Sequence, residues 1–129
     1  MTGAGLSEIG QIALPVADVG RAVAFYRDVL GVPLLFEAPP GLAFFDCAGI
    51  RLMLSGNEVA AEPRGGSVIY FRVPDIEATH ARLASEGVVF IDLPHLIAKL
   101  PDHELWMCFL RDTEGNMLAL MEERGKGAR

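Results

Sequence analysis

The segment IALPVADVGRAVAFYRDVLGV, residues 12–32, carries the pattern of a β-strand followed by a helix. Its first five residues alternate between larger and smaller side chains, as in a strand with two different faces. Asp18 predicts the start of the helix, because an aspartate there accepts backbone N–H bonds and opposes the helix dipole. Gly31 predicts its end, since glycine adopts the left-handed conformation that closes many helices. We therefore expect a helix over residues 18–30.

The second half of the chain repeats this order of features. VIYFRVPDI, residues 68–76, again places an aspartate just after an alternating strand, and a second helical stretch over residues 75–86 ends at Gly87. Residues 46–54 and 112–120 each begin with Asp, carry Gly three residues later and end in an apolar strand. This spacing predicts a tight turn before the last strand of each half. The internal similarity favours a duplicated βαβββ module.

We expect one domain, residues 1–129, because each half is short for a domain that folds stably by itself. In each module one helix would cover one face of a curved sheet and leave the other face open. Two such sheets side by side would form a concave, mostly apolar trough. The predicted class is α+β, with module one at about 8–57, a linker at 58–66 and module two at 67–123. Strands are expected near residues 11–16, 34–37, 42–46, 51–55, 68–73, 88–93, 105–111 and 117–122.

The composition excludes several classes of protein. Hydrophobic residues make up 51% of the 129 residues, which excludes intrinsic disorder. No apolar run is long enough to span a membrane, and a net charge of −6 argues against a nucleic-acid partner. The cysteines, Cys47 and Cys108, lie far apart, which fits a reducing cytoplasm. A mean hydropathy of +0.33 predicts apolar surface in excess of the core, for a subunit interface or a ligand pocket.

Two stretches, residues 12–32 and FLRDTEGNMLALME at 109–122, resemble the vicinal oxygen chelate superfamily, which includes glyoxalase I, bleomycin-resistance proteins and extradiol dioxygenases. The resemblance runs from about residue 9 to residue 123. It implies paired βαβββ modules, a cupped mixed sheet around a central pocket, and commonly a homodimer.

Many members of this superfamily bind a divalent metal ion through four residues, one on the first and one on the last strand of each module. Where they commonly carry His, Glu, His and Glu, this chain has Gln11, Met53, Val68 and Ala119. Met, Val and Ala offer no useful oxygen or nitrogen donor, and Gln11 alone offers one weak amide oxygen. The sequence therefore predicts neither the usual metal ion nor another cofactor, and glyoxalase or dioxygenase chemistry does not transfer.

The residues expected to line the trough are those that alternate with the helix-facing positions. They are apolar and rich in methionine, and thioethers suit a cavity that accepts irregular apolar shapes. Ordinary core packing is the alternative interpretation of the methionines. The candidate ligand-binding residues are Gln11, Arg51, Met53, Val68, Tyr70, Arg72, His103, Trp106, Met117 and Ala119.

Three of these candidates have alternative interpretations. Arg51 and Arg72 are either solvated surface charges or, on a concave face, ligands for a carboxylate or phosphate. Trp106, the single tryptophan, is either a core or interface aromatic or a flat wall for an aromatic ligand.

The histidines near the expected mouth of the trough are candidates for proton transfer. His95 and His103 flank residues 96–102, which are expected to be a loop between strands. His95 is the candidate catalytic base, because an imidazole titrates near neutral pH. A relocated metal site built from His95, His103 and Glu104 is a further possibility, and loop histidines without a role are the alternative.

Three classes of function follow. The first is a cytoplasmic, metal-independent protein of the bleomycin-resistance kind that binds or sequesters an apolar or aromatic small molecule. The second is an enzyme of the lyase or isomerase type that uses His95 and an arginine. The third is an interaction module whose trough is filled by its own side chains. A homodimer is expected in addition, since it is the commonest symmetric assembly.

Overall fold

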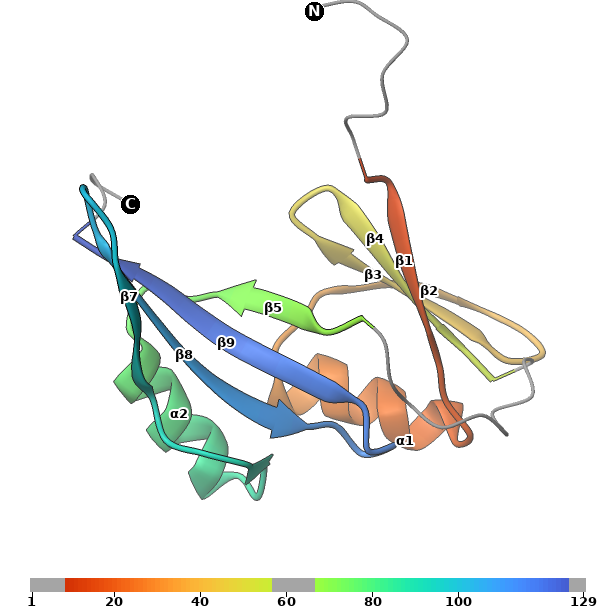
Figure 1. The fold of residues 1–129 in the computed structure, drawn as a ribbon. Helices are drawn as coiled ribbons and strands as arrows, with labels where there is room; N and C mark the ends of the chain where they lie inside the picture. Colours follow the sequence, from red (N-terminus) through yellow and green to blue (C-terminus); the bar gives the residue numbers. More distant parts are fainter. Residues whose placement is uncertain (1–8, 57–66, 126–129) are drawn as a thin grey trace, which may run out of the picture. The chain divides into compact units, whose positions relative to one another are not determined.

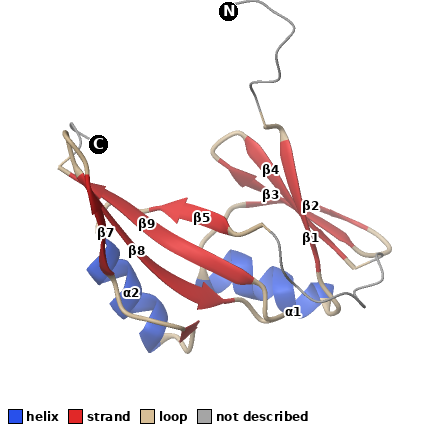
Figure 2. Ribbon diagram, in the orientation of Figure 1, coloured by secondary structure: helices blue, strands red, loops and turns tan. Residues whose placement is uncertain are grey.

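The computed structural model describes residues 9–56 and 67–125, and the chain divides into two compact units, Met1–Glu62 and Pro63–Arg129. Each unit contains one of the predicted modules, and the boundary between them falls within the predicted linker, which lies outside the described residues. Each unit combines helix with one sheet of mixed strand directions, so the predicted α+β class is confirmed (Figure 1, Figure 2). In the described part of the chain, no helix has the length and apolar character needed to span a membrane.

The first unit is a four-stranded sheet with a helical segment between its first two strands. The sheet order is β1-β4-β3-β2, in which β1 runs parallel to β4 and the other pairs are antiparallel. The elements are β1 (Gln11–Pro15), α1 (Val19–Ala24), η1 (Phe25–Val29), β2 (Leu34–Ala38), β3 (Leu42–Cys47) and β4 (Ile50–Ser55).

The helical segment begins where the sequence predicts and then changes type. Asp18 Oδ1 accepts the Arg21 backbone N–H at 3.0 Å, which caps α1. From Phe25 onward the segment is a π-helix, closed by the Leu30 N–H bonding to the Phe25 carbonyl five residues back. Gly31 then ends it with a φ of +80°. The expected single α-helix over 18–30 is therefore a short α-helix continued by a π-helix, a change that apolar periodicity does not signal.

The core of the first unit lies between its helical segment and one face of its sheet, where α1 contacts β3 and β4. Tyr26 from the π-helix is fully buried, and its ring lies 6.0 Å from that of Phe45 on β3. The other buried apolar side chains are Val16, Ala22, Val23, Val32, Ala43, Leu52 and Leu54.

The second unit is a five-stranded sheet with one longer helix. Its order is β5-β9-β8-β6, and β7 pairs with β8 as well; β5 is parallel to β9 and the remaining pairs are antiparallel. The elements are β5 (Ile69–Arg72), α2 (Ile76–Ser85), β6 (Val89–Phe90), β7 (His95–Lys99), β8 (Glu104–Arg111) and β9 (Met117–Arg124).

One part of this unit differs from the prediction. The strand expected over residues 88–93 is only Val89–Phe90, and the expected loop contains the additional strand β7. The Asp92 carboxylate accepts the Phe109 N–H at 2.8 Å, in place of a backbone carbonyl of the ladder. Pro94 has no N–H to donate, so pairing with β8 resumes only at His95.

The helix α2 packs against β9 and covers one face of the second sheet. Asp75 caps it by accepting the Ala78 N–H at 3.1 Å, as its sequence position predicts. The buried side chains beneath the helix are Ile76, Leu83, Val88, Cys108, Leu110, Leu118 and Leu120.

Candidate functional site

Each sheet has one face toward its own helix and a second face turned away from that helix. We call the second face of each sheet its open face. In β4, Leu52 and Leu54 are buried on the helix side, so Met53 between them lies on the opposite face. The open face of the first unit consists of Gln11, Ala13, Phe36, Phe44, Arg51 and Met53, and that of the second unit of Tyr70, Arg72, His95, Met107, Phe109, Met117, Ala119 and Met121.

Aromatic rings dominate the open face of the first unit. Phe44 lies directly opposite Met53 across β3 and β4, and opposite Phe36 across β2 and β3. The rings of Phe36 and Phe44 are stacked, with centroids 4.7 Å apart and planes inclined by 25°. Half of Phe36 is exposed. These residues form a flat apolar platform beside a methionine.

Two polar side chains border this platform. Gln11 Nε2 lies 3.9 Å from Met53 Sδ, which is a weak hydrogen bond. The Arg51 guanidinium carbon lies 5.8 Å from the Phe44 ring centroid, within the range of a cation–π contact. Gln11 and Arg51 are register partners across β1 and β4.

The open face of the second unit is built on a small residue between two aromatic ones. Ala119 on β9 is paired with Tyr70 on one side and Phe109 on the other. The two rings meet edge to face above it, with centroids 6.0 Å apart and planes at 78°. Ala119 is thereby fully buried, so it supports the lining instead of forming an exposed part of it.

A second row of residues crosses the same face, two residues further along β9 than Ala119. Met107 and Met121 face each other across β8 and β9, with Arg72 and His95 as their outer register partners. The Arg72 guanidinium pairs with Glu123 at 3.2 Å. The backbones of Arg72 and His95 are separated by three strand spacings, about 14 Å at ~4.8 Å each. Two methionines therefore lie between an ion-paired arginine and an imidazole.

The surroundings of His95 fix which ring nitrogen donates. Its Nδ1 lies 2.8 Å from the Leu93 carbonyl oxygen, which can only accept, so Nδ1 carries the hydrogen. In the neutral ring Nε2 is then the acceptor. Asp92 Oδ2 lies 3.9 Å from the same Nδ1.

The remaining sequence candidates lie elsewhere. His103 precedes β8, is mostly buried and lies 2.7 Å from the Asp102 carboxylate. It is separated from His95 by the whole length of β7, about 13 Å at ~3.3 Å per residue. The relocated metal site from His95, His103 and Glu104 is therefore not assembled in the described residues. Val68 directly precedes β5 and is half-buried.

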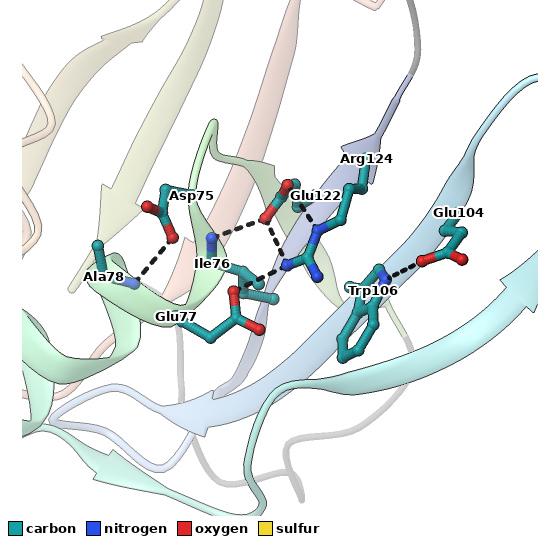
Figure 3. A network of polar contacts seen from close by, with 8 residues as sticks. All are labelled: Asp75, Ile76, Glu77, Ala78, Glu104, Trp106, Glu122 and Arg124. Carbon is teal, nitrogen blue, oxygen red and sulfur yellow. Dashed lines mark hydrogen bonds and ion pairs between the residues drawn. The ribbon is translucent and has the colours of Figure 1, made fainter.

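Trp106 lies on the helix-covered side of the second sheet, because its neighbours Leu105 and Met107 face the other way. Trp106 therefore does not form part of the open face. This placement differs from the interpretation of Trp106 as a flat wall for an aromatic ligand in the trough. The Arg124 guanidinium lies 4.3 Å from its ring centroid, and its indole N–H donates to Glu104 at 3.0 Å (Figure 3). In the part of the chain that the structure describes, both of these contacts join Trp106 to residues of its own unit.

The same side carries an acidic cluster that the sequence reasoning did not identify. Oxygen atoms of Asp75, Glu77 and Glu122 lie within 4.8 Å of one another (Figure 3). Glu122 accepts the Ile76 backbone N–H at 2.9 Å and binds Arg124, which also pairs with Glu77 at 2.7 Å. The hydrogen bond from Arg124 lowers the pKa of Glu122, against the opposing effect of burial. These partners explain the cluster as a link between β9 and the start of α2.

Sequence reasoning also missed Met107 and three phenylalanines, Phe36, Phe44 and Phe109, which supply most of the aromatic surface of the open faces. Phe44, Met107 and Phe109 are the register partners of Met53, Met121 and Ala119, which alternation assigned to the open faces. Phe36 is in turn the register partner of Phe44. To identify these residues one must know which residues lie opposite each other on neighbouring strands. The alternation within one strand does not give that register.

Comparison with known proteins gives matches across nearly the whole chain. The family model of the Glyoxalase/Bleomycin resistance protein/Dioxygenase superfamily matches residues 8–120. A Glyoxylase-like domain-containing protein of Didymella fabae is 30% identical over 129 residues, covering 92% of this chain and 96% of that protein.

Solved structures agree. The lactoylglutathione lyase of Agrobacterium tumefaciens is similar with a TM-score of 0.71 and 25% identity, over 92% of this chain and 95% of that one. TnmS3, an antibiotic binding protein from Streptomyces sp. CB03234, is similar with a TM-score of 0.73 and 25% identity, over 94% of this chain and 99% of that one. With the family model covering both modules, the chain belongs to the Glyoxalase/Bleomycin resistance protein/Dioxygenase superfamily.

Proposed function

We propose that this protein binds an aromatic or apolar small molecule against the open faces of its sheets, without a metal ion. The observation that carries the proposal is the chemistry of those faces. All four methionines in the described residues, Met53, Met107, Met117 and Met121, belong to them, beside the Phe36–Phe44 and Tyr70–Phe109 ring pairs. Polarisable thioethers and aromatic rings bind flat apolar ligands and adapt to their outlines.

The four metal-ligand positions of the superfamily support the metal-free part of the proposal. In the first unit, Gln11 and Met53 contact each other through an amide nitrogen and a sulfur atom. In the second, Ala119 presents a buried methyl group and Val68 an apolar side chain. Of the four side chains only that of Gln11 carries an oxygen donor, one weak amide oxygen, so together they do not fit a hard or borderline divalent ion.

Likeness to a known binding protein supports the ligand-binding part. TnmS3 is an antibiotic binding protein with the same fold over nearly the whole chain. An antibiotic or a comparable aromatic metabolite is therefore the first ligand class to test here.

Calorimetric titration of protein dialysed against EDTA tests the proposal. The ligands are a panel of hydrophobic antibiotics and naphthamide, a neutral aromatic probe. Phe36→Ala should weaken binding at the first unit by roughly threefold to tenfold, the value of one aromatic contact. Leu35→Ala is the matched control, because the neighbouring Leu35 is equally exposed but has no part in the ring stack. Absence of binding across the panel would favour an interaction module without a ligand.

A second candidate, an enzyme of the lyase or isomerase type, is favoured by one observation. The Nδ1–H···O bond of His95 to Leu93 leaves Nε2 as the proton acceptor on a face that also carries methionines and Arg72. An oriented imidazole beside an apolar surface is a suitable general base. His95→Ala separates the two functions: loss of turnover with binding kept indicates the enzyme, and unchanged binding with no turnover in either protein indicates sequestration.

We further propose a homodimer. Several large apolar side chains on β6 and in the segment from β6 to β7 are exposed, with Val89 at 64% and Leu93 at 69%. Contiguous exposed apolar residues are typical of interfaces. Sedimentation at micromolar concentration should give a species of twice the chain mass, and a monomer alone would refute this assembly.

A further inference from the structure

We propose that the ligand is an aromatic anion, whose ring lies on the Phe36–Phe44 platform and whose carboxylate is bound by Arg51. This inference rests on the proposed function and specifies the ligand class that the first unit would select. It assigns to Arg51 the role of a specificity-determining residue.

Arg51 differs from the other open-face arginine in its partners. Arg72 is already neutralised by Glu123 at 3.2 Å. Among the residues that the structure describes, the side chain of Arg51 contacts the Phe44 ring and forms no ion pair. An exposed guanidinium on an apolar face is therefore available for an external anion.

The acidic residue paired in register with Arg51 has another hydrogen-bond partner. Asp46 is the register partner of Arg51 on β3, but its carboxylate turns to the hairpin and accepts the Gly49 N–H at 3.0 Å. Gly49 has a φ of +94°, and this bond holds the turn between β3 and β4. Asp46 is thus engaged in local structure.

The position of the guanidinium suits a bidentate contact. The guanidinium carbon lies 5.8 Å from the Phe44 ring centroid, and the described residues include no acidic side chain paired with its N–H donors. The N–H donors of a guanidinium match the two oxygens of a carboxylate. An apolar neighbour such as the Phe44 ring reduces the access of water, which competes with the carboxylate for these donors. Gln11, directly across β1 and β4, adds an amide beside the same point. Phe36 and Phe44 supply the surface for the attached ring.

The negative charge of the whole chain opposes the binding of an anion. A net charge of −6 repels anions at long range, so affinity for one must come from a local cation. Added salt should therefore weaken the local contact while it relieves the general repulsion.

Competing titrations with naphthoate and its neutral isostere naphthamide test the inference. At neutral pH the unmodified protein should bind naphthoate about tenfold more tightly, as expected for hydrogen bonds to a charged group. Arg51→Met keeps the length of the side chain and should abolish this preference while naphthamide binding stays unchanged. Arg51→Lys should keep part of it. Arg27→Met is the matched control that should keep all of it, because Arg27 lies on η1 of the same unit and pairs with Asp28 at 2.7 Å.

The outcomes separate the two proposals. Equal binding of the two probes, or a preference that survives in Arg51→Met, overturns the role of Arg51 and leaves the binding function intact. Failure of both probes and of the antibiotic panel overturns the binding function and the inference together. Circular dichroism of each variant verifies that the exposed substitution leaves the fold unchanged.

Discussion

The rings of Tyr70 and Phe109 meet edge to face, 6.0 Å between centroids, although β9 lies between their strands. The contact is possible because their shared register partner is Ala119, whose methyl group is too small to separate them. The small side chain of Ala119 thus allows the aromatic surface of the second unit to form.

Ala119→Leu should destabilise the protein. Ala119 is fully buried, so the added atoms must displace the Tyr70 or Phe109 ring, and overpacking of this kind costs about 1–3 kcal/mol. Urea denaturation measures the change in the free energy of unfolding. Ala13→Leu is the control: Ala13 is register partner to Met53 in the first unit but is exposed, and its substitution should cost little. Equal effects of the two changes would contradict the packing described for Ala119.

Glu122→Gln should remove an acid-sensitive contribution to stability. The glutamine oxygen still accepts the Ile76 N–H, but the charge that binds Arg124 is lost, which costs about 1 kcal/mol at neutral pH. Because Arg124 lowers the pKa of Glu122 from its ordinary 4.5, the ionised form stabilises the fold above that value. This stability is lost as the pH falls through the lowered pKa.

Thermal denaturation at a series of pH values checks this sign. The difference between the unmodified protein and Glu122→Gln should shrink as the pH decreases below about 4. Glu86→Gln is the control, since Glu86 is exposed and its pair with Arg82 at 3.4 Å contributes little. A difference that grows on acidification would contradict the assigned interaction.

Cys108 should resist thiol reagents in the folded protein. Burial, with the nearby Asp92 carboxylate, raises the pKa of its thiol to about 12, so almost no thiolate exists at about pH 8. The measurement uses a Cys47→Ser variant, in which Cys108 is the remaining cysteine. Ellman's reagent should react slowly with this folded variant and rapidly with it in guanidinium chloride. Equal rates would contradict the buried position of Cys108.

Local signals in the sequence predicted most of the fold. Asp18 and Asp75 cap the two helices as expected, because capping depends on a few adjacent residues. The strand β7 was missed because its formation depends on residues far apart in the sequence. The Asp92 carboxylate accepts the Phe109 N–H and interrupts the backbone pairing with β8, which resumes after Pro94. A contact between residues 17 positions apart, such as Asp92 and Phe109, leaves no periodic pattern in the sequence.

The candidate site was predicted in part. Alternation assigned Met53, Tyr70 and Arg72 to open faces, because side-chain direction in a strand has a period of two. It did not show that Glu123 neutralises Arg72, nor that Phe44 lies beside Arg51. Those relationships depend on the register between strands, which tertiary packing sets.

Methionine methyl resonances give the most direct test of metal-free binding on the open faces. Protein labelled with ¹³C in the methionine methyl groups, kept in EDTA and titrated with naphthamide, reports on all four open-face methionines at once. Ring currents of the bound probe should shift Met53 in the first unit, or Met107, Met117 and Met121 in the second, with saturation. Resonances are assigned by single Met→Leu variants. Binding detected by calorimetry that leaves all four methyl resonances unmoved would contradict the account.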